Sequence, residues 1–212
     1  MTKDRLLVYG DSLTYGDGLP DCHIPPSIPG VRPSLLGWPS IMSRYMNKTC
    51  VNRGSPGSSN KRIWHTIINT EYSTNDTVII LWTYPARYCI IKTDSIVDIS
   101  LHRDREYYKY MYDDNDALLT NKLFVRDANN YLASKNVTVY NLVIGLRYIE
   151  IFDEHINHIP IYLYKIREHY RLALDNSHPG LDCNMEFARQ LLNYLNIAND
   201  INPVVTINGN TL

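Results

Sequence analysis

Short apolar runs alternate with longer polar stretches along most of this 212-residue chain. Residues 77–82 (TVIILW) are apolar almost without interruption, which is typical of a strand buried on both faces of a parallel sheet. Further strands are predicted where the apolar runs are shorter or weaker. In chain order these are residues 6–9, 49–52, 137–143 and 159–164.

Segments with helical periodicity separate these runs. The first covers residues 35–46, the second begins near Asn60, and the third lies within residues 114–134. The last is the clearest, because apolar residues share one helical face behind Asp182, a candidate N-cap. That face consists of Met185, Ala188, Leu191, Leu192 and Leu195. Strands alternating with helices predict an α/β fold, a three-layer α/β/α sandwich with a mostly parallel, flavodoxin-like sheet. We expect a single domain over residues 1–212.

Two segments interrupt the alternation. Residues 17–34 contain five prolines, which predicts a loop, and a loop of this length inside a compact domain is usually functional or disordered. Residues 199–212 lack helical periodicity, so we expect an edge strand or a loose end there.

Composition narrows the class of protein. Hydrophobic residues make up 44% of the chain and charged residues 20%, and the formal net charge is −1. These values are typical of a soluble globular protein and do not favour nucleic acid or an anionic membrane as a partner. The first apolar run is too short for a signal peptide or a membrane span, and the four cysteines form no C-x-x-C pair. We therefore expect reduced thiols and a cytoplasmic location.

A serine follows the first predicted strand, in Gly10-Asp11-Ser12-Leu13. Ligands of open α/β sheets bind beyond the carboxyl ends of the strands, so this position suits a nucleophile. A helix or turn that begins after Ser12 would also direct free N–H groups at an anion formed on the substrate. The alternative is an ordinary loop tripeptide, and the motif alone is weak evidence.

Asp175 and His178 lie in a D-x-x-H tetrapeptide before the last predicted helix. A serine hydroxyl needs a general base, and a carboxylate that accepts a hydrogen bond from histidine Nδ1 fixes the tautomer of that base. One short loop can hold both side chains. The alternative is a pair that only caps the helix.

A third block, residues 52–60 (NRGSPGSSN), follows the second predicted strand. The backbone N–H of a glycine such as Gly57 can approach a substrate oxygen closely, as an oxyanion hole requires. The alternative is a strand-to-helix turn with Asn60 as N-cap, and both interpretations can hold together.

These three blocks resemble the SGNH (GDSL-type) hydrolase family in letters, in order and in their placement after strands one and two and before the final helix. The resemblance spans nearly the whole chain. It implies a serine esterase with Ser12 as nucleophile, His178 as base and Asp175 as its partner. The backbone N–H groups of Ser12 and Gly57 would form the oxyanion hole, and no metal or organic cofactor is needed.

The family's usual asparagine block after the third strand is missing, and Tyr84 stands in its place. Three side chains are candidates for the missing oxyanion donor: the Tyr84 hydroxyl, the Arg87 guanidinium and the Asn60 amide. We favour Arg87, whose fixed charge could hold an oxyanion or an acidic substrate. A surface ion pair is an equal alternative for Arg87. One lost donor typically costs about 2.7–4 kcal/mol of transition-state stabilisation.

Other patterns are weaker. The H-x-x-H of His155 and His158 lacks a further ligand at recognisable spacing, so a solvated loop is the better interpretation and no metal site is predicted. The glycines near Ser12 do not match a dinucleotide-binding loop. The tyrosine clusters favour packing over sugar stacking.

The preferred substrate is a small-molecule or carbohydrate ester with a short or acetyl acyl group, and specificity would reside in residues 17–34 and in an insert near residues 95–115. Two rival hypotheses are a catalytically weak domain that binds carbohydrate or a protein partner, and a flavodoxin-like flavin or nucleotide binder.

Overall fold

The computed structural model describes residues 4–26, 28–100, 103–197, 206–207 and 210–211. A parallel sheet forms its centre, with the strand order β4-β1-β5-β8. The strands are β1 (Arg5–Tyr9), β4 (Thr49–Asn52), β5 (Thr77–Trp82) and β8 (Thr138–Val143). Counted along the chain the order is second, first, third, fourth, which is the flavodoxin-like order. The predicted α/β class and parallel sheet are confirmed.

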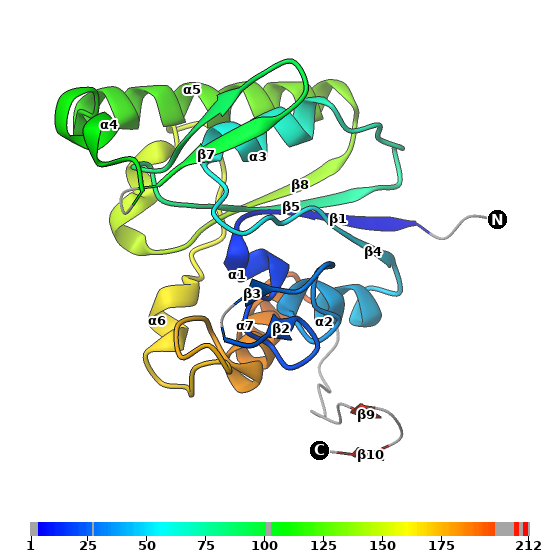
Figure 1. Ribbon diagram of the computed structural model, residues 1–212. Helices are drawn as coiled ribbons and strands as arrows, with labels where there is room; N and C mark the ends of the chain where they lie inside the picture. The colour runs from blue at the N-terminus through cyan, green and yellow to red at the C-terminus, as the bar shows by residue number, and fades with distance from the viewer. Residues whose placement is uncertain (1–3, 27, 101–102, 198–205, 208–209, 212) are drawn as a thin grey trace.

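Two pairs of helices cover the two faces of the sheet (Figure 1). One layer contains α2 (Trp38–Tyr45) and α7 (Leu181–Tyr194), and the other contains α3 (Asn60–Ile68) and α5 (Asp114–Ser134). Successive side chains of a strand point to opposite faces, so Leu6 of β1 packs towards α2 and α7 while Leu7 packs towards α3 and α5. Each such buried aliphatic side chain contributes about 1.5–3 kcal/mol. The three-layer sandwich is therefore confirmed.

The helix bounds differ from the predictions mainly at their starts. The helix predicted from residue 35 begins at Trp38, with Gly37 as N-cap. Asn60 is the first residue of α3 and not its N-cap, because the Ser59 hydroxyl accepts the capping hydrogen bond from the Arg62 amide. Gly180, not Asp182, is the N-cap of α7, so the Asp182 carboxylate lies in the first turn.

The fifth predicted strand, residues 159–164, does not form. The chain makes only a single parallel bridge, between Asn141 and His158, and then enters α6 (Leu163–Arg167). Pro160 has no N–H for a strand ladder. Ile159, Leu163 and Ile166 are spaced by four and three residues, which is helical spacing, and all are buried in the core that includes α2 and α7.

The remaining elements surround the carboxyl ends of the strands. Residues 17–34 form the predicted loop, with a short antiparallel pair of β2 (His23–Ile24) and β3 (Ile28–Pro29). A hairpin of β6 (Tyr88–Ile91) and β7 (Ile96–Ile99), followed by α4 (Arg105–Tyr110), was not predicted. The other short helices are α1 (Ser12–Tyr15) and the 3-10 helix η1 (Leu146–Ile151).

In the tail, β9 (Thr206–Ile207) pairs only with β10 (Asn210–Thr211), and the rest of residues 199–212 lies outside the described residues. The four cysteines are free thiols, as predicted. Among the described residues, no helix combines the length and the apolar character that crossing a bilayer requires.

Candidate active site

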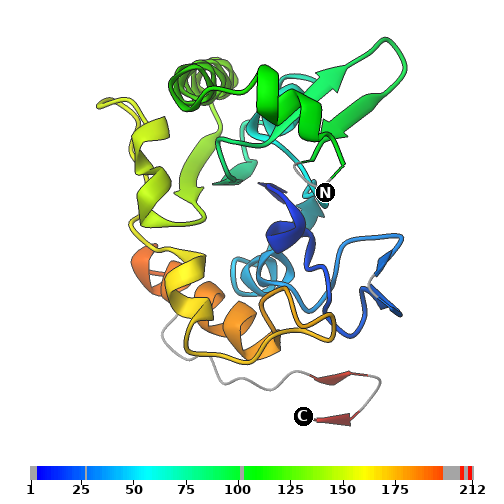
Figure 2. The same cartoon turned by 60° about the vertical axis from the view of Figure 1, so that its left-hand side comes forward.

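Ser12 follows the carboxyl end of β1, as the first residue of α1. Figure 2 shows this short helix in blue directly after the first strand. The residue surface of Ser12 is only 6% exposed. The preceding Asp11 is fully buried and caps the helix, because its Oδ1 accepts a hydrogen bond from the Leu13 amide at 3.0 Å. This cap fixes the backbone around Ser12 at the end of the central strand.

Hydrogen bonds attach the second block to the first. The Asn52 side-chain amide donates to the carbonyl of Thr14 at 2.7 Å, and the Ser55 amide donates to the carbonyl of Gly10 at 3.1 Å. Gly57 follows on the exposed side of this turn with φ +77°, a left-handed conformation that favours glycine. Within the described part of the chain, no hydrogen bond uses the Gly57 amide, so this N–H is free to bind a substrate oxygen.

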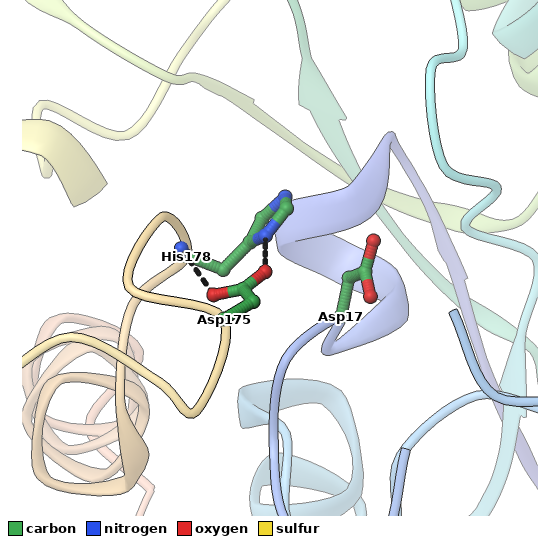
Figure 3. Close-up of side chains that lie close together, drawn as sticks. All are labelled: Asp17, Asp175 and His178. Carbon is green, nitrogen blue, oxygen red and sulfur yellow. Dashed lines mark hydrogen bonds and ion pairs between the residues drawn. The ribbon is translucent and has the colours of Figure 1, made fainter. Parts of the chain in front are cut away.

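Asp175 and His178 form a hydrogen-bonded pair in the loop before α7 (Figure 3). Nδ1 of His178 lies 2.5 Å from Oδ2 of Asp175, and Oδ1 of Asp175 accepts from the amides of Ser177 and His178 at 3.0 Å each. Burial alone would raise the pKa of Asp175, but the hydrogen bonds from the His178 amide and ring and from the Ser177 amide lower it. The carboxylate is thus held ionised against the imidazole.

The loop that carries this pair packs against the segment that follows α1. The Leu174 amide donates to the carbonyl of Gly18 at 3.0 Å. Gly18 has φ +80°, and a Cβ there would lie 2.7 Å from the Asp175 carboxylate. Only glycine fits this contact, which brings the pair of Asp175 and His178 close to the segment that begins with Ser12.

Asp17 is a third titratable residue of the site, beside Asp175 and His178, and it was not predicted. Its amide donates to the carbonyl of Ser12 at 3.1 Å, and its side chain lies close to Asp175 and His178 of the neighbouring loop (Figure 3). One carboxylate oxygen of Asp17, one of Asp175 and one ring nitrogen of His178 all lie within 4.8 Å of one another. Asp17 is 9% exposed, and burial raises its pKa. The sequence held no signal for it, because it begins an irregular loop.

The hydroxyl of Ser12 and the ring of His178 are not hydrogen-bonded to each other in the portion of the chain that the structure describes. Catalytic hydrogen bonds of ligand-free enzymes are often long and tighten only when substrate is bound. Asp17 connects the two candidate catalytic residues. Its amide is hydrogen-bonded to the Ser12 carbonyl and its carboxylate lies beside His178, so Ser12 and His178 are on adjoining segments.

Arg87, the favoured third oxyanion donor, forms an ion pair inside the molecule. Its guanidinium donates to Oδ2 of Asp11 at 2.6 Å and to Oγ1 of Thr83 at 3.1 Å, and it lies over the ring of Tyr84. The Thr83 hydroxyl donates to the same Asp11 oxygen at 2.7 Å. The partner carboxylate is buried, so a surface ion pair does not describe Arg87, whose Nη1 group holds the residue next to Ser12. Nε and Nη2 of Arg87 form no hydrogen bond with the residues that the structure describes, so its role as an oxyanion donor stays a prediction.

The other two candidate donors are also engaged. The fully buried Asn60 amide donates to the Thr83 carbonyl at 3.0 Å and to Asn121 Oδ1 at 2.7 Å, so both of its N–H groups are used. The Tyr84 hydroxyl is hydrogen-bonded to the hydroxyl of Tyr164. Asn60 therefore has no free donor for a substrate, whereas either hydroxyl can be the donor in the bond between Tyr84 and Tyr164.

Metal-ligating side chains gather at one place in the described residues, the cluster of Asp17, Asp175 and His178. These are ligand types that zinc accepts. However, Nδ1 of His178 and both oxygens of Asp175 are already used in hydrogen bonds within the loop, which is the donor arrangement of a histidine base and its carboxylate. His158 of the H-x-x-H pattern stacks on Phe152, with ring centroids 5.0 Å apart.

No protein-family model and no curated protein matches the chain in sequence. Solved structures do match its fold. An acetyl xylan esterase from the rumen bacterium Butyrivibrio proteoclasticus superimposes with a TM-score of 0.63 at 13% identity, over 92% of this chain and 64% of that chain. The chain thus spans slightly less than two thirds of that esterase.

Two further structures match over nearly their whole length. An alpha/beta hydrolase enzyme from the metagenome of Lake Arreo has a TM-score of 0.58 at 14% identity, with 94% of this chain and 98% of that chain covered. A member of the lipolytic protein G-D-S-L family from Veillonella parvula has a TM-score of 0.52 at 13% identity, with 92% and 99% covered. This protein therefore has the α/β fold of G-D-S-L lipolytic proteins and carbohydrate esterases.

Proposed function

We propose that this protein is a serine ester hydrolase. The observation that carries the proposal is the Asp175–His178 pair, held by Gly18 and Asp17 against the segment that begins with Ser12. In the proposed reaction His178 accepts the Ser12 proton, and Ser12 Oγ attacks the ester carbonyl. The N–H groups of Ser12 and Gly57 stabilise the oxyanion, and His178 then protonates the departing alcohol. Water attacks the acyl-enzyme with the same base.

The proposed substrate class is a short-chain or acetyl ester of a small molecule or carbohydrate. The acetyl xylan esterase that shares the fold supports this choice. Because Asn60 uses both of its N–H groups elsewhere, Nε or Nη2 of Arg87 is the candidate third donor beside the backbone N–H groups of Ser12 and Gly57. Without a third donor, kcat would be lower by about 10²–10³ and the reaction would stay the same.

Labelling with a fluorophosphonate probe and hydrolysis of p-nitrophenyl acetate test this proposal together. We expect the wild type to become labelled and to hydrolyse the ester, and Ser12→Ala to lose both activities. Ser134→Ala, at the exposed end of α5, is the matched serine control and should behave as the wild type. A wild type that is folded but neither labelled nor active would instead favour the alternative of a binding domain without esterase activity.

The Asp17 carboxylate is expected to lower the stability of the folded protein and to raise its catalytic activity. Its pKa is raised by burial, so its ionisation at neutral pH costs the folded state free energy. Asp17→Asn should therefore raise Tm at pH 7. This gain should vanish at pH 3, below the ordinary aspartate pKa of about 3.9, where the carboxyl is protonated in both states. Removing the negative charge beside His178 should also lower kcat/KM by about threefold to tenfold, because the imidazolium is less stabilised.

Thermal unfolding and kcat/KM of the two proteins across this pH range measure both effects. Asp94→Asn, in the exposed turn between β6 and β7, is the matched control and should change neither quantity. An Asp17→Asn protein that is less stable at pH 7 and equally active would contradict this role for Asp17.

A further inference from the structure

A recess lies beside the candidate active site, between η1 and the segment of α6. We call it the basic groove, and its volume is about 920 Å³, within the usual range of about 300–1,000 Å³ for ligand sites. Its walls combine tyrosine rings with cationic side chains. The residues that matter here are Tyr84, Arg147, Tyr162, Tyr164, Lys165 and Arg167.

The charged side chains that line the groove carry a net positive charge. Arg147, Lys165 and Arg167 line it, and Glu168 is the one carboxylate among its lining residues. None of the three cations forms an ion pair with a carboxylate of the described residues. The whole chain has a net charge of −1, so the cluster is a local feature. Three unpaired cations in one recess create a potential that favours an anionic ligand.

A second recess on the other side of Tyr84 differs in charge. It lies beside Gly57 and has a volume of about 1250 Å³. The charged side chains that line it balance, because Arg87 and Arg103 are matched by Asp98 and Asp114. Of these two recesses, the groove on the α6 side is the one with a net positive charge.

Tyrosine side chains in the basic groove are held in fixed positions. The Tyr164 hydroxyl is hydrogen-bonded to that of Tyr84, and the Arg167 guanidinium lies 5.5 Å from the Tyr164 ring centroid. Tyrosine offers an apolar face for the C–H groups of a sugar ring and a hydroxyl for hydrogen bonding. A guanidinium group matches the geometry of a carboxylate.

The groove is joined to the catalytic loop directly. Arg167 donates to the carbonyl of Ser177 at 2.6 Å, one residue before His178. Tyr84 follows Thr83, whose hydroxyl is bonded to Asp11 beside Ser12. Residues that line the groove are thus linked to the segments that carry the proposed base and the proposed nucleophile.

We propose that the basic groove binds the alcohol portion of the ester substrate and that this portion is an acidic, carboxylate-bearing carbohydrate. The carboxylate pairs with Arg147 and Lys165 at the open side, and the sugar ring lies along the tyrosines. A recess lined in this way suits a discrete sugar chain, whereas a membrane surface favours a protruding apolar face with cations around it. This inference rests on the proposed esterase function for its biological meaning.

Direct binding tests it without any catalytic turnover. Calorimetry on the Ser12→Ala protein would compare an α-1,4-linked galacturonate trimer with the neutral galactose trimer of the same linkage. We expect the acidic trimer to bind at least about tenfold more tightly at low salt and to lose affinity at 0.5 M salt. Replacing Arg147 and Lys165 together by glutamine should remove this preference while leaving the weak neutral binding in place. Arg167 is kept, because it also supports the catalytic loop.

Lys122→Gln with Arg126→Gln is the matched control, since it removes two positive charges from a separate groove along α5. It should bind the acidic trimer like the parent protein. Equal affinity for the two trimers would overturn the proposal. So would unchanged acidic binding after the loss of Arg147 and Lys165, or an equal loss in the control. Binding to phosphatidylserine vesicles in place of the trimer would make the groove a lipid surface and would also overturn it.

Failure of this inference and failure of the esterase proposal are distinguishable. A protein that hydrolyses p-nitrophenyl acetate but ignores the acidic trimer retains the esterase function and loses the substrate class. A protein that binds the acidic trimer but never reacts with fluorophosphonate retains the binding site and loses the esterase function.

Discussion

Replacing Asp175 with asparagine is expected to lower kcat for ester hydrolysis by about 10⁴-fold. An asparagine carbonyl can still accept the Ser177 and His178 amides that now bind Oδ1, so the loop should keep its shape. Its amide would face Nδ1 of His178 as a donor and force the imidazole into the tautomer that cannot accept the Ser12 proton. The effect is thus on the chemistry and not on the fold.

Steady-state kinetics with p-nitrophenyl acetate measure the loss of kcat, and a thermal unfolding curve shows whether the fold is retained. Asp182→Asn is the matched control, because that carboxylate lies nearby in the first turn of α7 and is exposed. Its kcat should stay within about twofold of wild type. A kcat for Asp175→Asn within tenfold of wild type would exclude Asp175 as the partner of the base.

The largest effect on stability is expected at Arg87. Its partner Asp11 has a side chain only 1% exposed, while the Arg87 side chain is 29% exposed. Arg87→Met would leave the Asp11 carboxylate buried with the Thr83 hydroxyl and the Leu13 amide as its remaining partners. Breaking a buried ion pair from one side costs about 3–5 kcal/mol, and the partial exposure of the guanidinium puts our expectation near about 3 kcal/mol.

A second substitution tests whether the unpaired charge of Asp11 causes this loss of stability. Adding Asp11→Asn to Arg87→Met should recover most of the lost free energy of unfolding, because the amide oxygen can still accept from the Leu13 amide while the amide N–H group donates to the Thr83 hydroxyl. Arg126→Gln, in the more exposed pair with Asp153, should cost no more than about 1 kcal/mol. Urea denaturation of the four proteins measures these differences. A loss of the same size for Arg126→Gln and Arg87→Met would show that the buried carboxylate is not the cause.

The local pattern of hydrophobic residues was sufficient to predict the elements that only need to pack against the hydrophobic core. The strand at residues 77–82 and the helix at residues 114–134 have the predicted bounds. Both segments are long and regularly patterned, so burial alone decides their structure. Residues 159–164 show the limit of this reasoning. A short apolar run can form a strand or a helical turn, and here Pro160 and the fit of Leu163 into the core of α2 and α7 decided for the helix.

At the site, the three motif blocks could be found in the sequence because each has fixed spacing and directly follows a strand or precedes a helix. The partners of single side chains could not be found in this way. Asn60, Tyr84 and Arg87 were each plausible oxyanion donors by residue type. Each is hydrogen-bonded to a residue far away in the sequence, and these partners are Asn121, Tyr164 and Asp11. Such pairings depend on how distant segments pack against each other, so they cannot be predicted from the spacing of residues within one segment.

The sequence by itself determined the α/β class, the order of the blocks and the candidates Ser12, Gly57, Asp175 and His178, because periodicity and motif spacing are local properties. The tertiary structure alone decided that Arg87 supports Asp11, that Asp17 lies beside His178, and that Arg147, Lys165 and Arg167 line one groove with tyrosines. Charges interact through space, so two charged side chains affect each other strongly only when the folded chain brings them within a few ångströms.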